Sequence, residues 1–436
     1  MKIDFVDLKT QYKRIKPEID SAIQEVIDSA AFVKGPQIKT FENNLAKELN
    51  VKHVIACANG TDALQIAMMA LDLKPGDEVI LPVFTYVATA EVIALLGLIP
   101  VMVDVEADTF CLDVNLIESK ITSKTKAIVP VHLFGQCADM EGIMRIAKKH
   151  NLFVIEDTAQ ALGARYEMRN EKWEMGERER ETDQITPSPL PPLSPSNSDI
   201  HKYAACIGHI GTTSFFPSKN LGCYGDGGAL MTNDDELAKK IRMICNHGQS
   251  VQYVHDVIGV NSRLDSIQAA ILNAKLPHLK EYENARNEAA GWYDELLGNH
   301  PIIIIPKRNP NSTHVFHQYT IRIMNDELLI MNEKRAASTH QSSFIHHSSF
   351  IIHNSSFRDQ IRKAMADRGI PTMVYYPIEL HKQKAFEKYW NGKDQFPVSE
   401  QLCATVLSLP MHTEMTREMV EFICKNLIEA IEKNRK

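Results

Sequence analysis

A short β-type run leads into one lysine and then into a glycine-rich turn at residues 214–228, which read SFFPSKNLGCYGDGG. An amine held in a partly dry pocket loses its proton more easily, and only the neutral amine attacks a carbonyl. The glycines permit positive backbone φ and the close approach of a ligand. Lys219 is therefore a candidate nucleophile, although a surface lysine before a turn has the same pattern.

Two other stretches carry groups that suit such a lysine. Residues 154–160, VIEDTAQ, are an apolar strand that ends in the carboxylate of Asp157. Residues 58–64, ANGTDAL, are a strand-to-helix turn that can hold a phosphate at a helix N-terminus. A lysine for a Schiff base, an aspartate for a pyridinium nitrogen and a phosphate cradle together describe the binding of pyridoxal 5′-phosphate (PLP).

With these stretches the chain resembles the DegT/DnrJ/EryC1/StrS family of PLP-dependent nucleotide-sugar aminotransferases. The resemblance runs from about residue 4 to residue 433, apart from two insertions. It is closest to the subgroup that aminates a UDP-linked 3-keto-N-acetylglucosaminuronic acid. It implies the α/β fold-type I architecture, with a mostly parallel seven-stranded sheet in a large domain and a small C-terminal α/β domain. It also implies a homodimer with shared active sites.

The resemblance implies a role for each residue around the cofactor. Lys219 forms the Schiff base and then moves the proton between the substrate and cofactor carbons. Asp157 faces the pyridine nitrogen and keeps it protonated. The other implied cofactor contacts are the phosphate ligands Gly60, Thr61 and Ser214, the ring-covering Tyr86, Gln160 near the ring hydroxyl, and Asn261, which reaches the cofactor of the neighbouring subunit.

Several of these residues also fit ordinary structural roles. Asp157 at a strand end can cap the next turn, and Thr61 can be the N-cap of the following helix. Gln160 can be a solvated loop amide, and Tyr86 at a helix start can belong to the core. The sequence alone leaves these alternatives open.

Three residues are candidates for substrate binding. Residues 261–265, NSRLD, open a helix, and the resemblance lets Arg263 meet a sugar carboxylate, which suits its planar fork. The alternative is a surface ion pair with Asp265. Tyr376 and His381 lie in or just after the stretch YYPIEL, residues 375–380, which resembles part of the nucleotide-sugar site. A structural histidine fits His381 nearly as well.

The bulk composition narrows the class of protein. The chain has 436 residues and a net charge of −7, which gives no reason to expect a nucleic-acid partner. Its eight cysteines are scattered without a C-x-x-C pair, which predicts reduced thiols in the cytoplasm and no zinc site. The first residues lack the apolar core of a signal peptide. The longest apolar run, residues 92–103, is too short to span a membrane.

Short apolar runs alternate with helical patterns from residue 53 to about residue 232, as in a parallel sheet buried on both faces. No G-x-G-x-x-G motif follows the first strand, so a dinucleotide-binding fold is disfavoured. We expect strands at 53–57, 78–82, 100–103, 126–131, 152–156, 212–216 and 228–232, and helices at 61–72, 86–97, 139–149 and 234–246.

The remaining parts flank this region. Residues 1–50 are predicted to form a helical arm, residues 51–260 the large domain, and residues 261–436 a linking helix and the small domain. The arm has helical patterns at 12–29 and 41–49. The third part is expected to hold one or two helices at 261–299, strands at 317–323 and 372–376, and helices at 358–368 and 416–433.

Two segments interrupt the pattern. Residues 167–206 pass from a charged run into a Pro/Ser-rich run, which cannot bury a core and predicts a disordered insertion. A proline-rich ligand for a partner is the less favoured alternative. Residues 324–356 contain three SSF repeats and predict a low-complexity insertion. Its four histidines have no carboxylate or thiol nearby, so we expect no metal site; they are His340, His346, His347 and His353.

The sequence therefore predicts a PLP-dependent aminotransferase that moves an amino group from glutamate to a keto nucleotide sugar, in the synthesis of a surface polysaccharide precursor. A different 3- or 4-keto sugar remains an alternative. A sugar dehydratase of the same scaffold is disfavoured, because a histidine replaces the lysine in that branch. A PLP-binding regulatory protein without turnover is the alternative from another class.

Overall fold

The computed structural model describes residues 1–168, 201–325 and 348–435. The predictions for the whole Pro/Ser-rich run and for His340, His346 and His347 fall on residues outside these ranges. The side chains of residues 348–355 are also not described, so the fourth, His353, has only a backbone position. Within the described ranges, no helix has the length and apolar character needed to cross a membrane.

The large sheet has seven strands in the order β1-β9-β8-β5-β4-β2-β3. Neighbours from β8 to β3 pair in parallel, and only β9 runs against both of its neighbours. The predicted mostly parallel seven-stranded sheet is therefore confirmed. Its strands are β1 (His53–Cys57), β9 (Gly228–Thr232), β8 (Ile210–Ser214), β5 (Phe153–Asp157), β4 (Thr125–Ile128), β2 (Glu78–Pro82) and β3 (Ile99–Val103).

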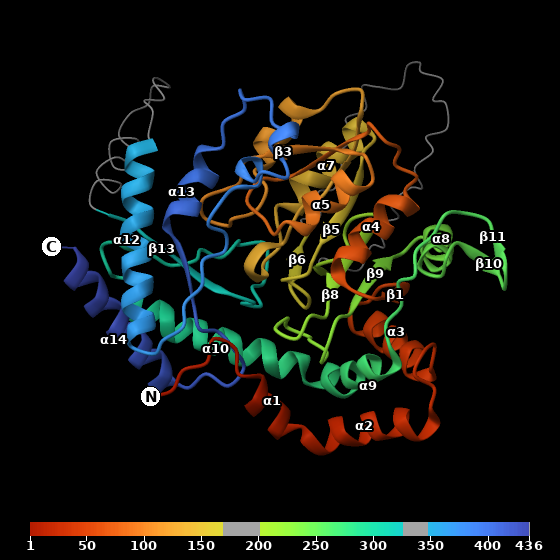
Figure 1. Ribbon diagram of the computed structural model, residues 1–436, viewed down its shortest axis with the longest axis horizontal. Helices are drawn as coiled ribbons and strands as arrows, with labels where there is room; N and C mark the ends of the chain where they lie inside the picture. Colours follow the sequence, from red (N-terminus) through yellow and green to blue (C-terminus); the bar gives the residue numbers. More distant parts are fainter. Residues whose placement is uncertain (169–200, 326–347, 436) are drawn as a thin grey trace, which may run out of the picture.

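Helices cover both faces of this sheet (Figure 1). Successive side chains of a strand point to opposite faces. Ile55 of β1 packs in the cluster that holds α4 (Gly60–Ala70), α5 (Ala88–Leu95) and α8 (Asp235–Cys245). Its neighbour Val54 packs with α3 (Pro36–Glu48) and α9 (Ser266–Lys275) in the cluster on the other side. Helix α7 (Met140–His150) packs on β4 and β5.

The N-terminal arm lies along the linking helices (Figure 1). It contains α1 (Leu8–Arg14), α2 (Lys16–Ser29) and α3 (Pro36–Glu48). The helix expected at 12–29 is split at Ile15, because Pro17 fits the first turn of a new helix. The linking region forms α9 (Ser266–Lys275) and α10 (Leu279–Leu297), which a 3₁₀ turn joins, and Ile19 of α2 packs against Ile271 of α9.

A second, antiparallel sheet belongs to the C-terminal part. It consists of β12 (Ile303–Ile304), β13 (Tyr319–Ile323) and β14 (Val406–Leu409), and it packs with α10, α12 (Ser348–Asp367) and α14 (Arg417–Asn434). The boundaries at residues 50 and 260 stay predictions.

Two predictions for this part were wrong in extent, and two elements of it were missed. The strand expected at 372–376 is a single bridge between Met373 and Ser408, since β14 takes the edge of the sheet. Both β14 and α13 (Pro397–Thr405) were not predicted. The helix expected from residue 358 begins at Ser348, so the end of the predicted second insertion is helical.

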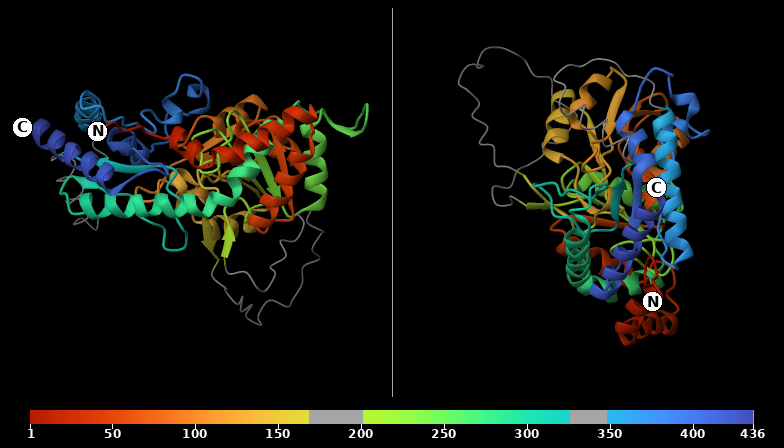
Figure 2. Two further views of the ribbon diagram at one scale, coloured as in Figure 1. Left: turned by 90° about the horizontal axis from the view of Figure 1, so that it is seen from below. Right: turned by 90° about the vertical axis from the view of Figure 1, so that its left-hand side faces the viewer.

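The first predicted insertion is also bounded by regular structure. Strand β6 (Arg165–Glu167) pairs with β7 (His201–Tyr203), which lies inside the predicted range 167–206. A second hairpin, β10 (Gln249–Val251) with β11 (Val254–His255), projects from the body of the molecule in Figure 1 and in the left view of Figure 2. The short helix α6 (Val114–Ile117) completes the list of α-helices in the described residues.

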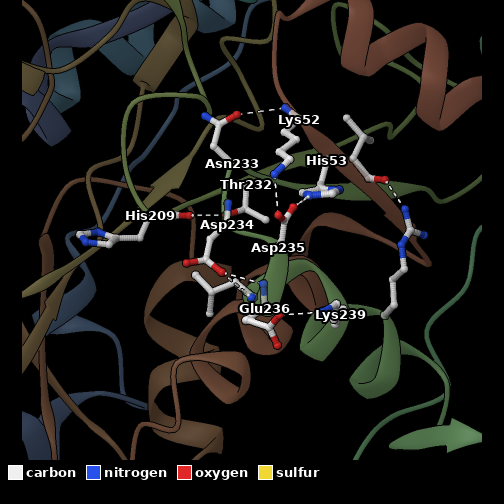
Figure 3. Close-up of polar contacts among 12 residues, drawn as sticks. Lys52, His53, His209, Thr232, Asn233, Asp234, Asp235, Glu236 and Lys239 are labelled. Atoms are coloured by element: carbon white, nitrogen blue, oxygen red, sulfur yellow. Dashed lines mark hydrogen bonds and ion pairs between the residues drawn. The ribbon is translucent and has the colours of Figure 1, made fainter. Parts of the chain in front are cut away.

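Polar contacts join the start of β1, the end of β9 and the start of α8 (Figure 3). The Lys52 amide donates to Asn233 Oδ1 at 3.0 Å, and His53 Nε2 lies 2.6 Å from Asp235 Oδ1. The Asp234 carboxylate caps α8 by accepting two first-turn N–H groups at 2.8 and 2.9 Å. The edge strand β1 is thus tied to the helix that follows β9.

Candidate active site

A cavity of about 480 Å³ lies where the carboxyl ends of β5 and β8 and the N-terminus of α4 meet. Parallel strands bring their carboxyl ends to one edge of a sheet, which is where open α/β sheets hold ligands. Eight of the residues predicted from the sequence line this cavity: Gly60, Thr61, Tyr86, Asp157, Gln160, Ser214, Lys219 and Tyr376.

Lys219 is half-buried in the cavity wall. Burial lowers the pKa of its amine to about 8, and the nearby carboxylate of Asp157 acts in the opposite direction. Its side chain forms no hydrogen bond or ion pair with any residue that the structure describes, while its backbone N–H donates to Phe216 O at 2.8 Å. The amine is therefore free to react and is held by a defined backbone.

Asp157 ends β5 and is buried against the cavity. Its Oδ2 accepts a hydrogen bond from Thr89 Oγ1 at 2.8 Å, and its Oδ1 accepts one from the Ala159 N–H at 3.2 Å. The contact with Ala159 is the turn cap that the sequence left open. Each carboxylate oxygen has a second lone pair, so Asp157 can still accept a hydrogen bond from a donor in the cavity while it caps the turn.

The residue before Asp157 serves the other face of β5. Glu156 is fully buried, and its Oε2 lies 3.0 Å from His132 Nε2. His132 Nδ1 accepts from the Ala138 N–H, so Nε2 carries the hydrogen that is donated to Glu156. The same carboxylate also accepts the backbone N–H groups of Ala205, Ile207 and Gly208 at 3.0, 2.7 and 2.6 Å.

The start of α4 forms a cradle for an anion. Asn59 is the N-cap, and its side chain accepts the Asp62 N–H at 2.8 Å, so the alternative that Thr61 is the N-cap is wrong. A Cβ on Gly60 would lie 2.7 Å from the Ser214 Cβ, so only glycine lets the helix approach β8 this closely. The first N–H groups of a helix have no partner within it and attract a phosphate.

Gln160, Tyr86 and Tyr376 border the cavity on another side. Gln160 Oε1 accepts the Phe134 N–H at 2.8 Å, and Nε2 donates to the Tyr376 hydroxyl at 3.2 Å, so Gln160 is not a solvated loop amide. Burial raises the pKa of Tyr376. Tyr86 is 57% exposed with its ring centroid 6.2 Å from that of Tyr376, so it does not belong to the core.

Asn261 and Arg263 do not line the cavity of their own chain. The residue between them, Ser262, is buried and its Oγ accepts the Ala58 N–H at 3.0 Å, while Asn261 is exposed and Arg263 half-buried. The described part of the chain contains no ion pair between Arg263 and Asp265, so the alternative of a surface ion pair is not observed.

His381 also lies away from the cavity wall. It is 2% exposed, and its ring centroid lies 5.0 Å from that of Trp390 and 4.7 Å from that of Phe396. Burial lowers the pKa of His381 to about 4. These contacts place His381 in an aromatic cluster, while its buried Nδ1 has no hydrogen-bond partner among the described residues, so both the structural and the substrate-binding readings stay predictions.

The cavity residues that the sequence analysis missed include Thr85, His317 and Gln318. Each is more than nine-tenths buried and has a polar side-chain atom without a partner among the described residues. The only sequence signal was that the polar pair His317 and Gln318 directly precedes the apolar residues of β13. The backbone cradle at the start of α4, the carboxylate of Asp157 and an amine of lowered pKa all fit a phosphate-bearing aldehyde, so the residues present fit PLP.

Comparison with known proteins identifies the family. The family model described as the DegT/DnrJ/EryC1/StrS aminotransferase family matches residues 13–339 and 325–428. A UDP-2-acetamido-2-deoxy-3-oxo-D-glucuronate aminotransferase from Pseudomonas aeruginosa is 42% identical over 98% of this chain and 99% of its own. A UDP-N-acetyl-3-dehydro-α-D-glucosamine 3-aminotransferase from Acidithiobacillus ferrooxidans is 39% identical over 96% and 95%.

Two further proteins complete the comparison. A protein named pleiotropic regulatory protein, from Geobacillus stearothermophilus, is 39% identical over 98% of both chains. The crystal structure of DesV from S. venezuelae superposes with a TM-score of 0.81 at 32% identity over 99% of both chains. With the cavity and its lysine, these matches lead to one conclusion: the chain belongs to the DegT/DnrJ/EryC1/StrS aminotransferase family and is a PLP-dependent aminotransferase that acts on a keto nucleotide sugar.

Proposed function

We propose that this aminotransferase moves an amino group from glutamate to C3 of a UDP-linked 3-keto-N-acetylglucosaminuronic acid. The observation that carries the uronate assignment is Arg263, a half-buried guanidinium without a partner in the described residues. The similarity to the glucuronate aminotransferase supports the same substrate. A guanidinium is always charged and binds a carboxylate through two parallel hydrogen bonds.

The proposed amino-group transfer gives a role to five of the cavity residues. When bound, PLP supplies the electron sink. Lys219 anchors it and, as a neutral amine, takes and returns the proton at the reacting substrate carbon. Asp157 holds a proton on the ring nitrogen, and the N–H groups of Gly60 and Thr61 hold the phosphate with the Ser214 hydroxyl.

We also propose that the active unit is a homodimer in which Asn261 and Arg263 complete the partner's site. Ser262 is buried between them, so the two side chains share the outer face of an extended segment. An exposed apolar side chain lies beside this segment. It belongs to Val33, which is 56% exposed and forms a β-bridge with Asp265. The β10–β11 hairpin adds Tyr253 at 80% exposure. Such patches are typical of association surfaces.

The cellular setting follows from the same proposal. A nucleotide-sugar substrate and eight free, buried cysteines support a place in the cytoplasm, in the synthesis of a surface polysaccharide precursor such as O-antigen. The similarity to an aminotransferase for a neutral 3-keto sugar supports the alternative of a different keto nucleotide sugar. The regulatory name of one relative supports the alternative of a protein that binds PLP without turnover.

One experiment separates these possibilities. The purified protein is loaded with PLP, and glutamate is added while the visible absorbance of the cofactor is followed. We expect the band to convert, because a transaminase completes this half-reaction and a regulatory protein need not. A panel of keto nucleotide sugars is then supplied, and we expect the uronate to be aminated with the highest kcat/KM. A preference for the neutral 3-keto sugar would overturn the uronate assignment.

A further inference from the structure

Three neutral side chains with unpartnered polar atoms line the wall of the cavity. They are Thr85, His317 and Gln318, which are 3%, 6% and 7% exposed. The unpartnered atoms among the described residues are Thr85 Oγ1, His317 Nδ1 and Gln318 Oε1. Leaving a buried polar atom without a hydrogen bond costs free energy. A ligand that forms a hydrogen bond with each of these atoms would therefore bind more tightly.

The contact between two of these residues fixes what they offer. Gln318 Nε2 lies 3.4 Å from His317 Nε2, so the amide donates to that ring nitrogen. The hydrogen of the neutral imidazole is then on Nδ1, which is a donor, and Gln318 Oε1 is an acceptor. Burial and the neighbouring Lys219 lower the pKa of His317, which keeps its ring neutral. Thr85 adds a hydroxyl that both donates and accepts.

A buried cation holds this wall in place from behind. Arg286 of α10 is 3% exposed, and its Nη1 donates to the carbonyl oxygens of Phe316 at 3.0 Å and of His317 at 3.5 Å. It also donates to Met411 O at 3.2 Å, which ties the wall to the segment after β14. The Gln318 N–H donates to Phe134 O at 3.3 Å. The wall is therefore set by the fold before any ligand arrives.

The chemistry of the wall selects among ligand groups. Carboxylates and ionised phosphates only accept hydrogen bonds, so they cannot satisfy Gln318 Oε1. The only donor of glutamate is its ammonium group, which is also the group that reacts. A sugar hydroxyl donates one hydrogen bond and accepts others, and it therefore matches a wall that presents both kinds of atom.

We propose that Thr85, His317 and Gln318 form a hydroxyl-binding wall that holds the sugar ring of the acceptor beside Lys219. This inference rests on the proposed class of acceptor, a keto nucleotide sugar. It does not depend on whether the sugar is a uronate, because ring hydroxyls are common to both 3-keto substrates. The wall contributes to the binding of the acceptor and leaves the binding of glutamate to other groups.

The test uses two nearly isosteric variants, Gln318→Met and Thr85→Val, in the PLP-loaded dimer. We expect cofactor absorbance and the rate of the glutamate half-reaction to stay within about twofold of wild type, because neither side chain contacts the donor. We expect KM for the acceptor to rise roughly 10- to 100-fold, equally for the uronate and the neutral 3-keto sugar. The surface change Gln24→Met on α2 is the matched control and should alter neither half-reaction.

Each other result has a defined meaning. An equal loss in both half-reactions, or loss of cofactor absorbance, would show that the residues only support the fold or the cofactor and would overturn the wall. An unchanged acceptor KM in both variants would overturn it as well. A wild type that completes the glutamate half-reaction but aminates neither sugar would overturn the proposed acceptor, and the wall with it.

Discussion

The carboxylate of Asp157 opposes the effect of burial on the pKa of the Lys219 amine in the same cavity. Burial lowers the pKa of Lys219 to about 8, and the negative charge of Asp157 limits that shift. With the carboxylate assigned to the ring nitrogen, its charge is compensated when the cofactor is bound. The pair therefore gives an amine that is partly neutral near physiological pH before any cofactor arrives.

This relationship predicts the pH dependence of cofactor attachment. The neutral fraction of an amine rises with pH, and at pH 7 it is roughly 10% for a pKa of 8 but well below 0.1% for an ordinary lysine. We expect the rate at which apo-protein attaches PLP to rise with pH, to be half-maximal near pH 8 and to level off above about pH 9, as measured by stopped-flow absorbance. A rate that keeps rising to about pH 10 would contradict the lowered pKa.

Changing Lys219→Ala is expected to abolish both the reducible covalent adduct with PLP and all turnover. A second buried amine, Lys275, cannot take over, since it lies outside the cavity lining and donates to Gly222 O at 2.7 Å. PLP still binds through its phosphate. Borohydride reduction followed by mass spectrometry checks the adduct, with the exposed Lys239→Ala as the control. Persistence of the adduct and of activity would refute the assignment of Lys219.

The sequence predicted much of this site because its residues follow strand ends. Asp157 and Ser214 end two parallel strands and Gly60 opens a helix, so the α/β pattern alone brings them to one edge. Thr85 follows the end of the parallel strand β2, so the same pattern could have indicated it. The pair His317 and Gln318 was not found, because both residues reach the cavity from the C-terminal part. No local pattern records such a long-range approach.

The errors in the C-terminal part have a similar cause. Residues 397–409, PVSEQLCATVLSL, mix apolar and polar residues in an order in which helical and strand periods are not distinguishable. The structure divides it between α13 and β14. Residues 372–376 have the composition of a strand, but only Met373 finds a partner there. Pairing across the sheet, rather than local propensity, decided these elements.

If Asn261 acts across the dimer interface, two inactive variants should complement each other. A Lys219→Ala chain and an Asn261→Ala chain, each inactive as a homodimer, should form a heterodimer in which one of the two sites has both groups intact. We expect up to half of the wild-type activity per dimer, measured on heterodimers isolated with two affinity tags. Inactive heterodimers would place Asn261 in the site of its own chain.

Arg263→Ala should reduce kcat/KM for the uronate by roughly a hundredfold or more, because it leaves a substrate carboxylate without its partner. The loss should be much smaller for the neutral 3-keto sugar. Arg263→Lys keeps the charge but not the fork and is expected to fall in between. Equal losses on the two sugars would remove Arg263 as the group that recognises the carboxylate.

Replacing residues 169–200 or 326–347 with a short Gly/Ser link should leave the fold and PLP binding intact. The composition predicts surface insertions, and loop closure costs only about 0.6 kcal/mol for each doubling of length. The cuts spare β7 and α12, which the structure places inside the ranges first expected. Size-exclusion chromatography and cofactor absorbance are the measurements, and loss of the soluble dimer would show a structural role.

The two adjacent carboxylates at the end of β5 make the length of that strand more critical than its composition. Glu156 holds the loop at residues 205–208 on one face, and Asp157 faces the cavity on the other. Adding or removing one residue exchanges the faces of every side chain beyond that point. A chimaera with a relative should therefore keep its crossover points outside residues 153–157, since a shift there disables the catalytic edge and its supporting loop in a single event.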